Sequence, residues 1–254
     1  DLHLCDRRQR QMCIRDRPDF KKHLNKYDVI HLDIQWCLEP AGKAENLISY
    51  ISEKTISELK ECYPGVLKSD IVSLPEALAI INAETGNKFI VIIDEWDVLI
   101  RDEAANKNVQ EDYINFLRGM FKGTEPTKYI QLAYLTGILP MKKEKTQSAL
   151  NNFDEFTMLS PSNLAQYVGF TEDEVRGLAR EYNQDFDKVK MWYDGYLLRD
   201  YQVYNPRAVV SVMLKGEFKS YWSETASYEA IVPLINMNYD GLKTAIIAMI
   251  SGAE

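Results

Sequence analysis

The sequence predicts an α/β fold in which a parallel sheet is followed by an all-helical segment. Three observations support this prediction. Short apolar runs without polar alternation, of which Phe89–Ile93 is the clearest, are typical of strands buried on both faces of a parallel sheet. Stretches with helical periodicity separate these runs. After Leu159 the character of the sequence changes, and capping patterns favour helices throughout the rest of the chain.

Composition narrows the class of protein. The chain has 254 residues, 46% of them hydrophobic, and no apolar run reaches the ~20 residues that a membrane span needs. A net charge of −8 disfavours non-specific binding to nucleic-acid phosphates. The four cysteines have neither metal-site nor disulfide-scaffold spacing, and no secretory leader pattern is visible. We therefore expect a cytoplasmic protein that does not contact a membrane.

Residues 1–17 differ from the rest of the chain. They contain five arginines, three aspartates and no lysine, without helical or strand periodicity. A basic arm for nucleic acid is one interpretation. We favour a non-native or disordered tail, since Gln11–Arg17 looks like translated adaptor sequence, which would leave the natural N-terminal part of the protein out. The predicted domains are then a core at residues 18–159 and a helical domain at 160–254.

The expected core elements alternate between strands and helices. In chain order they are a strand at 29–34, helices at 44–62 and 74–85, a strand at 89–93, a helix at 108–121, a strand at 129–135 and a third buried strand at 153–159. Ser73 and Glu76 have capping-box spacing, and Gly86 stops the helix that they begin.

Capping patterns place the helices of the second domain. They begin at Ser160-Pro161, at the capping box Thr171–Glu174 and at Asn205-Pro206, with further helices at 186–193, 228–237 and 240–251. Gly195 and Gly216 are expected to end two of them, Gly195 in a left-handed conformation.

Two carboxylates follow the central apolar run. Ligands of open α/β sheets bind at the carboxyl ends of the strands, so Asp94 is placed to hold Mg²⁺ there. In P-loop NTPases an aspartate at this point is the Walker B residue, and the adjacent Glu95 could polarise the attacking water. The plain alternative is that both residues only begin a loop.

A polar residue also ends the next strand. Thr136 follows Ile130–Leu135, where a side chain can sense the γ-phosphate of a nucleotide, although a threonine that opens a turn before Gly137 is an equal alternative. The sequence contains no GxxxxGK[ST] loop, because at Gly42-Lys43 the first glycine and the hydroxyl residue are replaced by Cys37 and Ala44. Nucleotide affinity of this chain should therefore be very weak.

Several motifs together resemble one family. These are FIVIIDEWD at Phe89–Asp97, LAYLTGIL at Leu132–Leu139, QSALNN at Gln147–Asn152, WYDGY at Trp192–Tyr196, VYNP at Val203–Pro206 and Tyr221-Trp222. Residues 18–254 thus resemble the bacterial AAA-ATPase-like family, whose members often have a C-terminal PD-(D/E)XK nuclease-like domain.

The resemblance implies an incomplete P-loop NTPase core of the ASCE type with a helical lid. Asp94 would be the Walker B residue that binds Mg²⁺ and ATP, Glu95 the catalytic base, and Thr136 a sensor-like catalytic residue. Walker A and the nuclease part would lie outside this chain, so the fragment itself would be inactive, and nucleic acid would be a partner only through the nuclease-like domain. The resemblance also leaves room for a homo-oligomer.

Alternatives remain open at four places. Asp194 and its aromatic neighbours could contact nucleotide, or they could simply pack a helix end. Arg118 could act in trans as an arginine finger, or be a solvated helix-terminal arginine. Asp94, Glu95 and Asp97 could form a two-metal nuclease cluster, for which Glu217–Lys219 is a weak supporting motif. The whole domain could be a non-catalytic interaction module that retains an ATPase fold.

Overall fold

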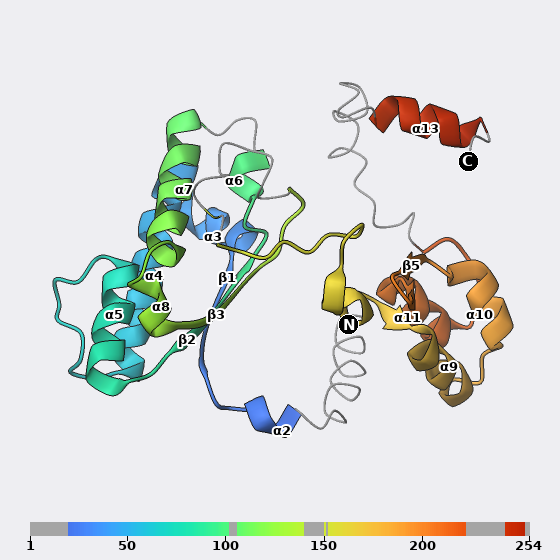
Figure 1. Ribbon diagram of the computed structural model, residues 1–254, viewed down its shortest axis with the longest axis horizontal. Coiled ribbons are helices and arrows are strands. Elements are labelled where there is room, and N and C mark those ends of the chain that lie inside the picture. Colours follow the sequence, from blue (N-terminus) through green and yellow to red (C-terminus); the bar gives the residue numbers. More distant parts are fainter. Residues whose placement is uncertain (1–19, 102–105, 140–149, 151, 222–241, 252–254) are drawn as a thin grey trace. The chain divides into compact units, whose positions relative to one another are not determined.

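A computed structural model describes residues 20–101, 106–139, 150, 152–221 and 242–251 (Figure 1). The chain divides into two compact units, one that ends at Thr157 and one that begins at Met158. In these described ranges, no helix combines the length and the apolar character that crossing a membrane requires.

The first unit is built on a parallel sheet with the strand order β1-β2-β3. Its strands are β1 (Asp28–Asp33), β2 (Phe89–Asp94) and β3 (Ile130–Leu135). Its helices are α2 (Phe20–His23), α3 (Ile34–Ala41), α4 (Leu47–Cys62), α5 (Leu74–Thr85), α6 (Val98–Arg101), α7 (Lys107–Phe121) and α8 (Pro126–Tyr129), with a 3₁₀ turn η1 (Ala44–Asn46). The predicted α/β class and parallel sheet are confirmed.

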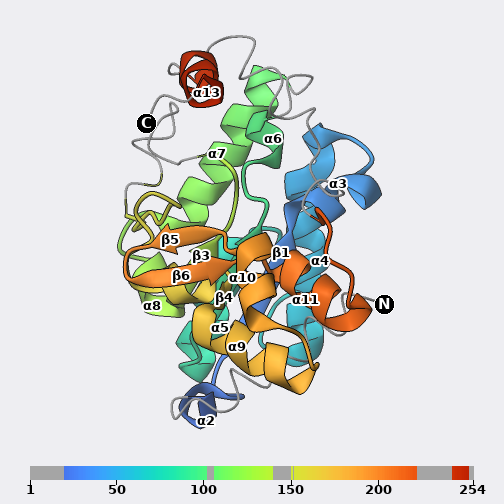
Figure 2. The same ribbon diagram turned by 90° about the vertical axis from the view of Figure 1, so that its right-hand side faces the viewer.

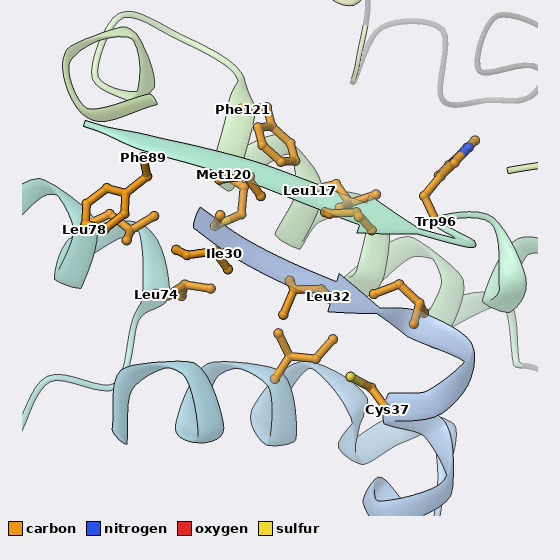
Figure 3. Close-up of a cluster of buried hydrophobic side chains, with 14 of the residues drawn as sticks. Ile30, Leu32, Cys37, Leu74, Leu78, Phe89, Trp96, Leu117, Met120 and Phe121 are labelled. Carbon is orange, nitrogen blue, oxygen red and sulfur yellow. The ribbon is translucent and has the colours of Figure 1, made fainter. Parts of the chain in front are cut away.

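The central strand β2 carries the core of this unit. Phe89, Val91 and Ile93 are buried, whereas Ile90 and Ile92 are half-buried, so one face of the strand is more completely covered than the other. Figure 3 shows the core around it, formed by side chains of β1, α3, α5 and α7 that include Ile30, Leu32, Cys37, Leu74, Leu78, Leu117, Met120 and Phe121. Burial of such a side chain stabilises the fold by roughly 1.5–3 kcal/mol, so this core holds the sheet and its helices together.

Helix ends follow the predicted signals in part. Gly86 adopts a left-handed conformation with φ 75°, and its N–H bonds to the carbonyl of Asn82, as expected for a C-terminal cap. Ser73 is the N-cap of α5, but its side chain makes no capping hydrogen bond, so the capping box predicted there is not formed.

The strand predicted at 153–159 is wrong, because these residues form bends and irregular structure. Phe153 instead packs edge-on against Phe121, with ring centroids 5.3 Å apart. Phe153 alone packs against the core, whereas Phe156, Met158 and Leu159 are exposed, so this stretch lacks the buried face of a core strand.

The second unit contains helices and a small antiparallel sheet with the order β4-β6-β5. Its elements are η3 (Ser162–Tyr167), β4 (Phe170–Thr171), α9 (Glu172–Glu181), α10 (Phe186–Tyr193), β5 (Tyr196–Leu198), β6 (Tyr201–Tyr204), α11 (Pro206–Lys215) and α13 (Leu242–Ile250). The capping box at Thr171 and Glu174 is formed, and Asn205 caps α11 as predicted. The predicted helix at 228–237 lies outside the described residues.

The prediction that the segment after residue 160 is all-helical is therefore wrong. β5 and β6 form a hairpin, seen side by side in Figure 2, that turns at Arg199-Asp200. Arg199 has a positive φ of 56°, a conformation in which glycine or asparagine is usual. Strands of three and four residues are too short for a period of two to stand out, and the turn lacks the common Asn-Gly or Asp-Gly sequence.

Candidate functional site

The loops that leave β2 and β3 are joined by backbone hydrogen bonds. Thr136, the first residue after β3, donates its N–H to the carbonyl of Ile93 at 2.9 Å. Trp96 donates its N–H back to the carbonyl of Thr136, also at 2.9 Å. These two bonds extend the pairing of the strands beyond their ends and bring the two predicted polar residues together.

Asp94 and Thr136 are in direct contact at this edge. The Thr136 hydroxyl donates a hydrogen bond to Oδ1 of Asp94. The N–H of Glu95 also lies 3.1 Å from this oxygen and 3.4 Å from the Thr136 hydroxyl oxygen. Asp94 is exposed, and its second oxygen, Oδ2, takes no part in these three contacts. The carboxylate is therefore held in one orientation with an oxygen left over for a ligand.

Glu95 has an unusual backbone conformation. Its φ is 55°, which is uncommon for a residue with a long side chain and costs about 1–3 kcal/mol. The two contacts of its N–H help to hold this conformation. Asp94 is the last residue of β2, and the turn at Glu95 takes the chain away from the strand, so that Glu95 does not continue its alternation.

The Glu95 carboxylate is ion-paired with Arg101 at the end of α6. The other side of the same guanidinium contacts Asp97, with Arg101 Nε 3.1 Å from Asp97 Oδ2, although its N–H is not directed at that oxygen. Asp97 is fully buried, whereas the Glu95 side chain is 43% exposed. The Glu95 carboxylate is thus accessible to solvent while Arg101 holds it in place.

The sequence analysis considered Asp97 only as a member of a two-metal cluster, and it did not single out Arg101. The available signal was a carboxylate inside the otherwise apolar run Trp96–Ile100, followed four residues later by an arginine. That spacing places both side chains on one face of a helix. Burial of Asp97 is a tertiary property, so its role could not be deduced from the pattern alone.

The donors present at the edge suit Mg²⁺ bound together with a phosphate. Mg²⁺ takes hard oxygen ligands and is usually held in proteins by one or two carboxylates plus waters and substrate phosphates. Asp94 supplies one exposed, oriented carboxylate. In the part of the chain that the structure describes, no group of three or more His, Cys, Asp or Glu side chains is placed to hold a metal ion. An all-protein metal site is therefore not what these residues offer.

The alternative of a two-metal nuclease cluster finds no support in the geometry. Asp97 is turned into the core and accepts backbone hydrogen bonds, so it does not join Asp94 and Glu95 at the surface. Phe218, in the middle of the weak nuclease motif, stacks on Tyr193 with ring centroids 6.1 Å apart. That motif belongs to the packing of the second unit.

The WYDGY segment of the second unit has structural roles. Tyr193 is buried and exchanges hydrogen bonds of 3.0 Å with the backbone of Lys219. Asp194 accepts a hydrogen bond from the side chain of Gln202. Gly195 does not have the predicted left-handed conformation, because in the described residues the positive φ values fall on other glycines. A side chain is excluded there for another reason: a Cβ would lie 2.8 Å from the carbonyl oxygen of Val203.

Arg118 lies in the last turn of α7 and donates a hydrogen bond of 3.0 Å to Asn115 on the same helix. This contact is what a solvated helix-terminal arginine makes. An action in trans stays a hypothesis.

Comparison with known proteins assigns most of the first unit to one family. A family model described as "Predicted AAA-ATPase" matches residues 7–146, which is more than half of the chain. An uncharacterized protein encoded in the vnfD 5′ region of Azotobacter chroococcum mcd 1 is 29% identical over 157 residues, which cover 61% of this chain and 30% of that protein. The chain thus spans less than a third of that relative. No solved structure matches the chain.

Proposed function

The chain belongs to the family of predicted AAA-ATPases, and on that premise we propose that its parallel-sheet unit provides the Mg²⁺-binding and water-activating part of an ATP-hydrolysing site. The observation that carries the proposal is the hydrogen bond from Thr136 to Asp94 at the carboxyl edge of the sheet. Two polar side chains from neighbouring strands converge there, where open α/β sheets bind their ligands.

Each residue has a role in this proposal. Asp94 offers its free oxygen to Mg²⁺, which when bound would neutralise charge on the phosphate oxygens. Glu95 faces solvent beside Asp94 and accepts a proton from the attacking water. Thr136 orients Asp94 through its hydroxyl, and the same hydroxyl is close enough to the edge to respond to a terminal phosphate. The phosphate cradle is not assigned to residues 1–254, since they contain no GxxxxGK[ST] sequence.

The proposal is tested by Glu95→Gln in the protein expressed from its complete gene. The amide keeps the size of the side chain but accepts a proton poorly, so ATP turnover should fall by about 10²–10⁴-fold while ATP affinity stays within about threefold. Steady-state phosphate release and nucleotide-binding titration measure the two quantities. Glu125→Gln is the matched control, because Glu125 is also ion-paired, to Lys128 at 2.6 Å, but lies away from this edge.

Unchanged turnover in Glu95→Gln would remove Glu95 from the mechanism. A wild-type protein without ATP turnover would favour the second candidate, a non-catalytic interaction module with an ATPase fold. The exposed Asp94, whose Oδ2 is outside the contacts with Thr136 and Glu95, and the solvent-facing Glu95 favour the catalytic candidate, because a binding module has no need to hold two carboxylates at a strand end in a strained turn.

A further inference from the structure

Asp97 is a carboxylate in the interior of the first unit. It is fully buried, between Trp96 and Val98, which are also buried. A carboxylate removed from water is strongly destabilising unless it is paired and hydrogen-bonded. The contacts of Asp97 therefore explain why the fold tolerates it.

Two backbone amides of the loop after β3 donate to Asp97. The N–H of Ile138 lies 3.0 Å from Oδ2, and the N–H of Leu139 lies 2.7 Å from the same oxygen. Arg101 Nε lies 3.1 Å from it. One carboxylate oxygen thus joins the loop after β3 to the helix that follows β2.

The loop after β3 passes close to Asp97 because its residue nearest to Trp96 and Asp97 is a glycine, Gly137. A Cβ on Gly137 would lie 2.7 Å from Asp97 Oδ1 and 2.6 Å from Trp96 Cδ1. Real Cβ atoms do not approach other atoms so closely. Gly137 therefore allows the two amides to reach the carboxylate.

In these contacts, Asp97 touches neither Thr136 nor Glu95 directly. It instead contacts groups that position each of them. The two amides belong to residues two and three positions after Thr136. The guanidinium that contacts Asp97 is the same one that pairs with Glu95. A shift of Asp97 would consequently move both side chains that the proposed reaction uses.

We infer that Asp97 is a positioning residue that couples Glu95 to Thr136, so that the water-activating carboxylate and the strand-tip hydroxyl keep a fixed relation. This inference rests on the proposed function. Its physical basis is that reacting groups lose rate steeply when they are displaced: about 1 Å of misplacement can cost a hundredfold in rate.

The test is Asp97→Asn in the protein expressed from its complete gene. The amide preserves shape but loses the charge, and hydrogen bonds to a neutral acceptor are roughly half as strong. The turnover number should fall about ten- to hundredfold, while KM for ATP stays within about threefold, since the groups that hold the nucleotide are not altered.

Asp185→Asn is the matched control. Asp185 also accepts two backbone amides with one oxygen, from Asp187 at 2.9 Å and Lys188 at 3.3 Å, but in the second unit. Amide hydrogen exchange of the 254-residue chain provides a second readout. Exchange at Ile138 and Leu139 should rise about tenfold in Asp97→Asn and stay unchanged in the control.

The outcomes separate the inference from the proposed function. Wild-type turnover in Asp97→Asn, with Glu95→Gln inactive, overturns the inference and leaves the function standing. A loss of rate accompanied by faster exchange throughout the first unit, or by a parallel rise in KM, shows a role in stability only and also overturns it. Absence of turnover in the wild-type protein removes the proposed function, and the inference with it.

Discussion

Asp94 and Asp194 both follow a run of apolar or aromatic residues, and they differ in what surrounds the carboxylate. Asp94 ends the central strand of a parallel sheet and keeps one oxygen outside its contacts with Thr136 and Glu95. Asp194 ends a helix and accepts a hydrogen bond from Gln202 of the adjacent hairpin.

The difference teaches that the element before an acidic residue indicates its use better than the residues beside it. A parallel strand ends at an edge where neighbouring strands also end, so its last polar residue meets others from distant parts of the sequence. A helix C-terminus offers carbonyl groups and repels negative charge, so an aspartate there needs a local donor. We therefore expect substitutions near Asp94 to alter chemistry and those near Asp194 to alter stability.

The largest effects on stability should come from adding one methyl group in each segment. Gly137→Ala places a Cβ 2.6 Å from Trp96, and Gly195→Ala places one 2.8 Å from the carbonyl of Val203. Each should lower the free energy of unfolding by about 1–3 kcal/mol, because the crowded atoms must move. Urea denaturation measures the loss, and amide hydrogen exchange shows in which unit it occurs.

Two helical glycines are the controls for this pair. A Cβ on Gly119 of α7 or on Gly177 of α9 would meet nothing within 4 Å. Alanine at either position should be neutral or stabilising by up to about 1 kcal/mol, since alanine favours a helix over glycine. The comparison of the segments is broken if Gly195→Ala reduces ATP turnover per folded molecule as much as Gly137→Ala does.

A smaller effect should distinguish two buried tyrosines. The Tyr193 hydroxyl donates to the carbonyl of Lys219 and accepts from its N–H, so Tyr193→Phe removes two hydrogen bonds of a buried side chain and should cost about 1–2 kcal/mol. The Tyr113 hydroxyl has no hydrogen-bond partner in the described part of the chain. Tyr113→Phe should therefore be neutral or stabilising by up to about 1 kcal/mol.

Urea denaturation of both variants checks this prediction. The pKa of Tyr113 is raised by burial first and then by Asp97 and Cys37, so its hydroxyl stays protonated as a donor without an acceptor. A clear loss of stability in Tyr113→Phe would show that this hydroxyl does have a partner and that the region behind Asp97 is more polar than its contacts suggest.

The smallest effect concerns Glu172, at the start of α9. Arg176 and Lys190 lie 2.9 Å and 2.7 Å from its two carboxylate oxygens. The hydrogen bond from Lys190 is the largest cause that holds the pKa of Glu172 below its ordinary value of 4.5, against the opposing effect of burial. Glu172→Gln should lower the free energy of unfolding by at most about 1 kcal/mol at neutral pH, as for other surface ion pairs.

The pH dependence follows from the direction of this shift. A lowered pKa in the folded state means that the contribution is fully present above the ordinary value and is lost as the pH falls through the folded value. The difference between wild type and Glu172→Gln should therefore shrink as the pH falls below 4.5 and through the folded value, measured by urea denaturation at neutral and at acid pH. Glu58→Gln, which breaks an exposed pair with Lys54, is the control. A difference that widens in acid would contradict the assignment.

Local signals account for what the sequence predicted well. Five apolar residues in a row identified β2, and Gly86 marked the end of α5, because both depend on neighbouring residues. Asp94, Glu95 and Thr136 were placed at one edge from strand order alone, and the structure brings them into contact. Their catalytic and metal-binding roles stay predictions.

What the sequence did not predict depends on contacts between distant segments. The positioning role inferred for Asp97 depends on hydrogen bonds from Ile138 and Leu139, which are about 40 residues away in the sequence. A left-handed conformation was the wrong explanation for the glycine at position 195. The glycine is needed because strand pairing brings the carbonyl of Val203 close to it. The hairpin was missed because its strands are short and Arg199 occupies the turn.

The crossing of the two loops has a consequence for spectroscopy. The indole of Trp96 is 2% exposed and lies against the backbone of Gly137, beside the carboxylate that joins the loops. Trp36 and Trp192 are exposed and emit at longer wavelengths than a buried indole. Among the tryptophans that the structure describes, light emitted at the blue edge of the spectrum therefore comes preferentially from Trp96, and we expect its intensity to change when the two loops separate. Trp96 is therefore an intrinsic fluorescent probe of the sheet edge at which we propose that the nucleotide is cleaved.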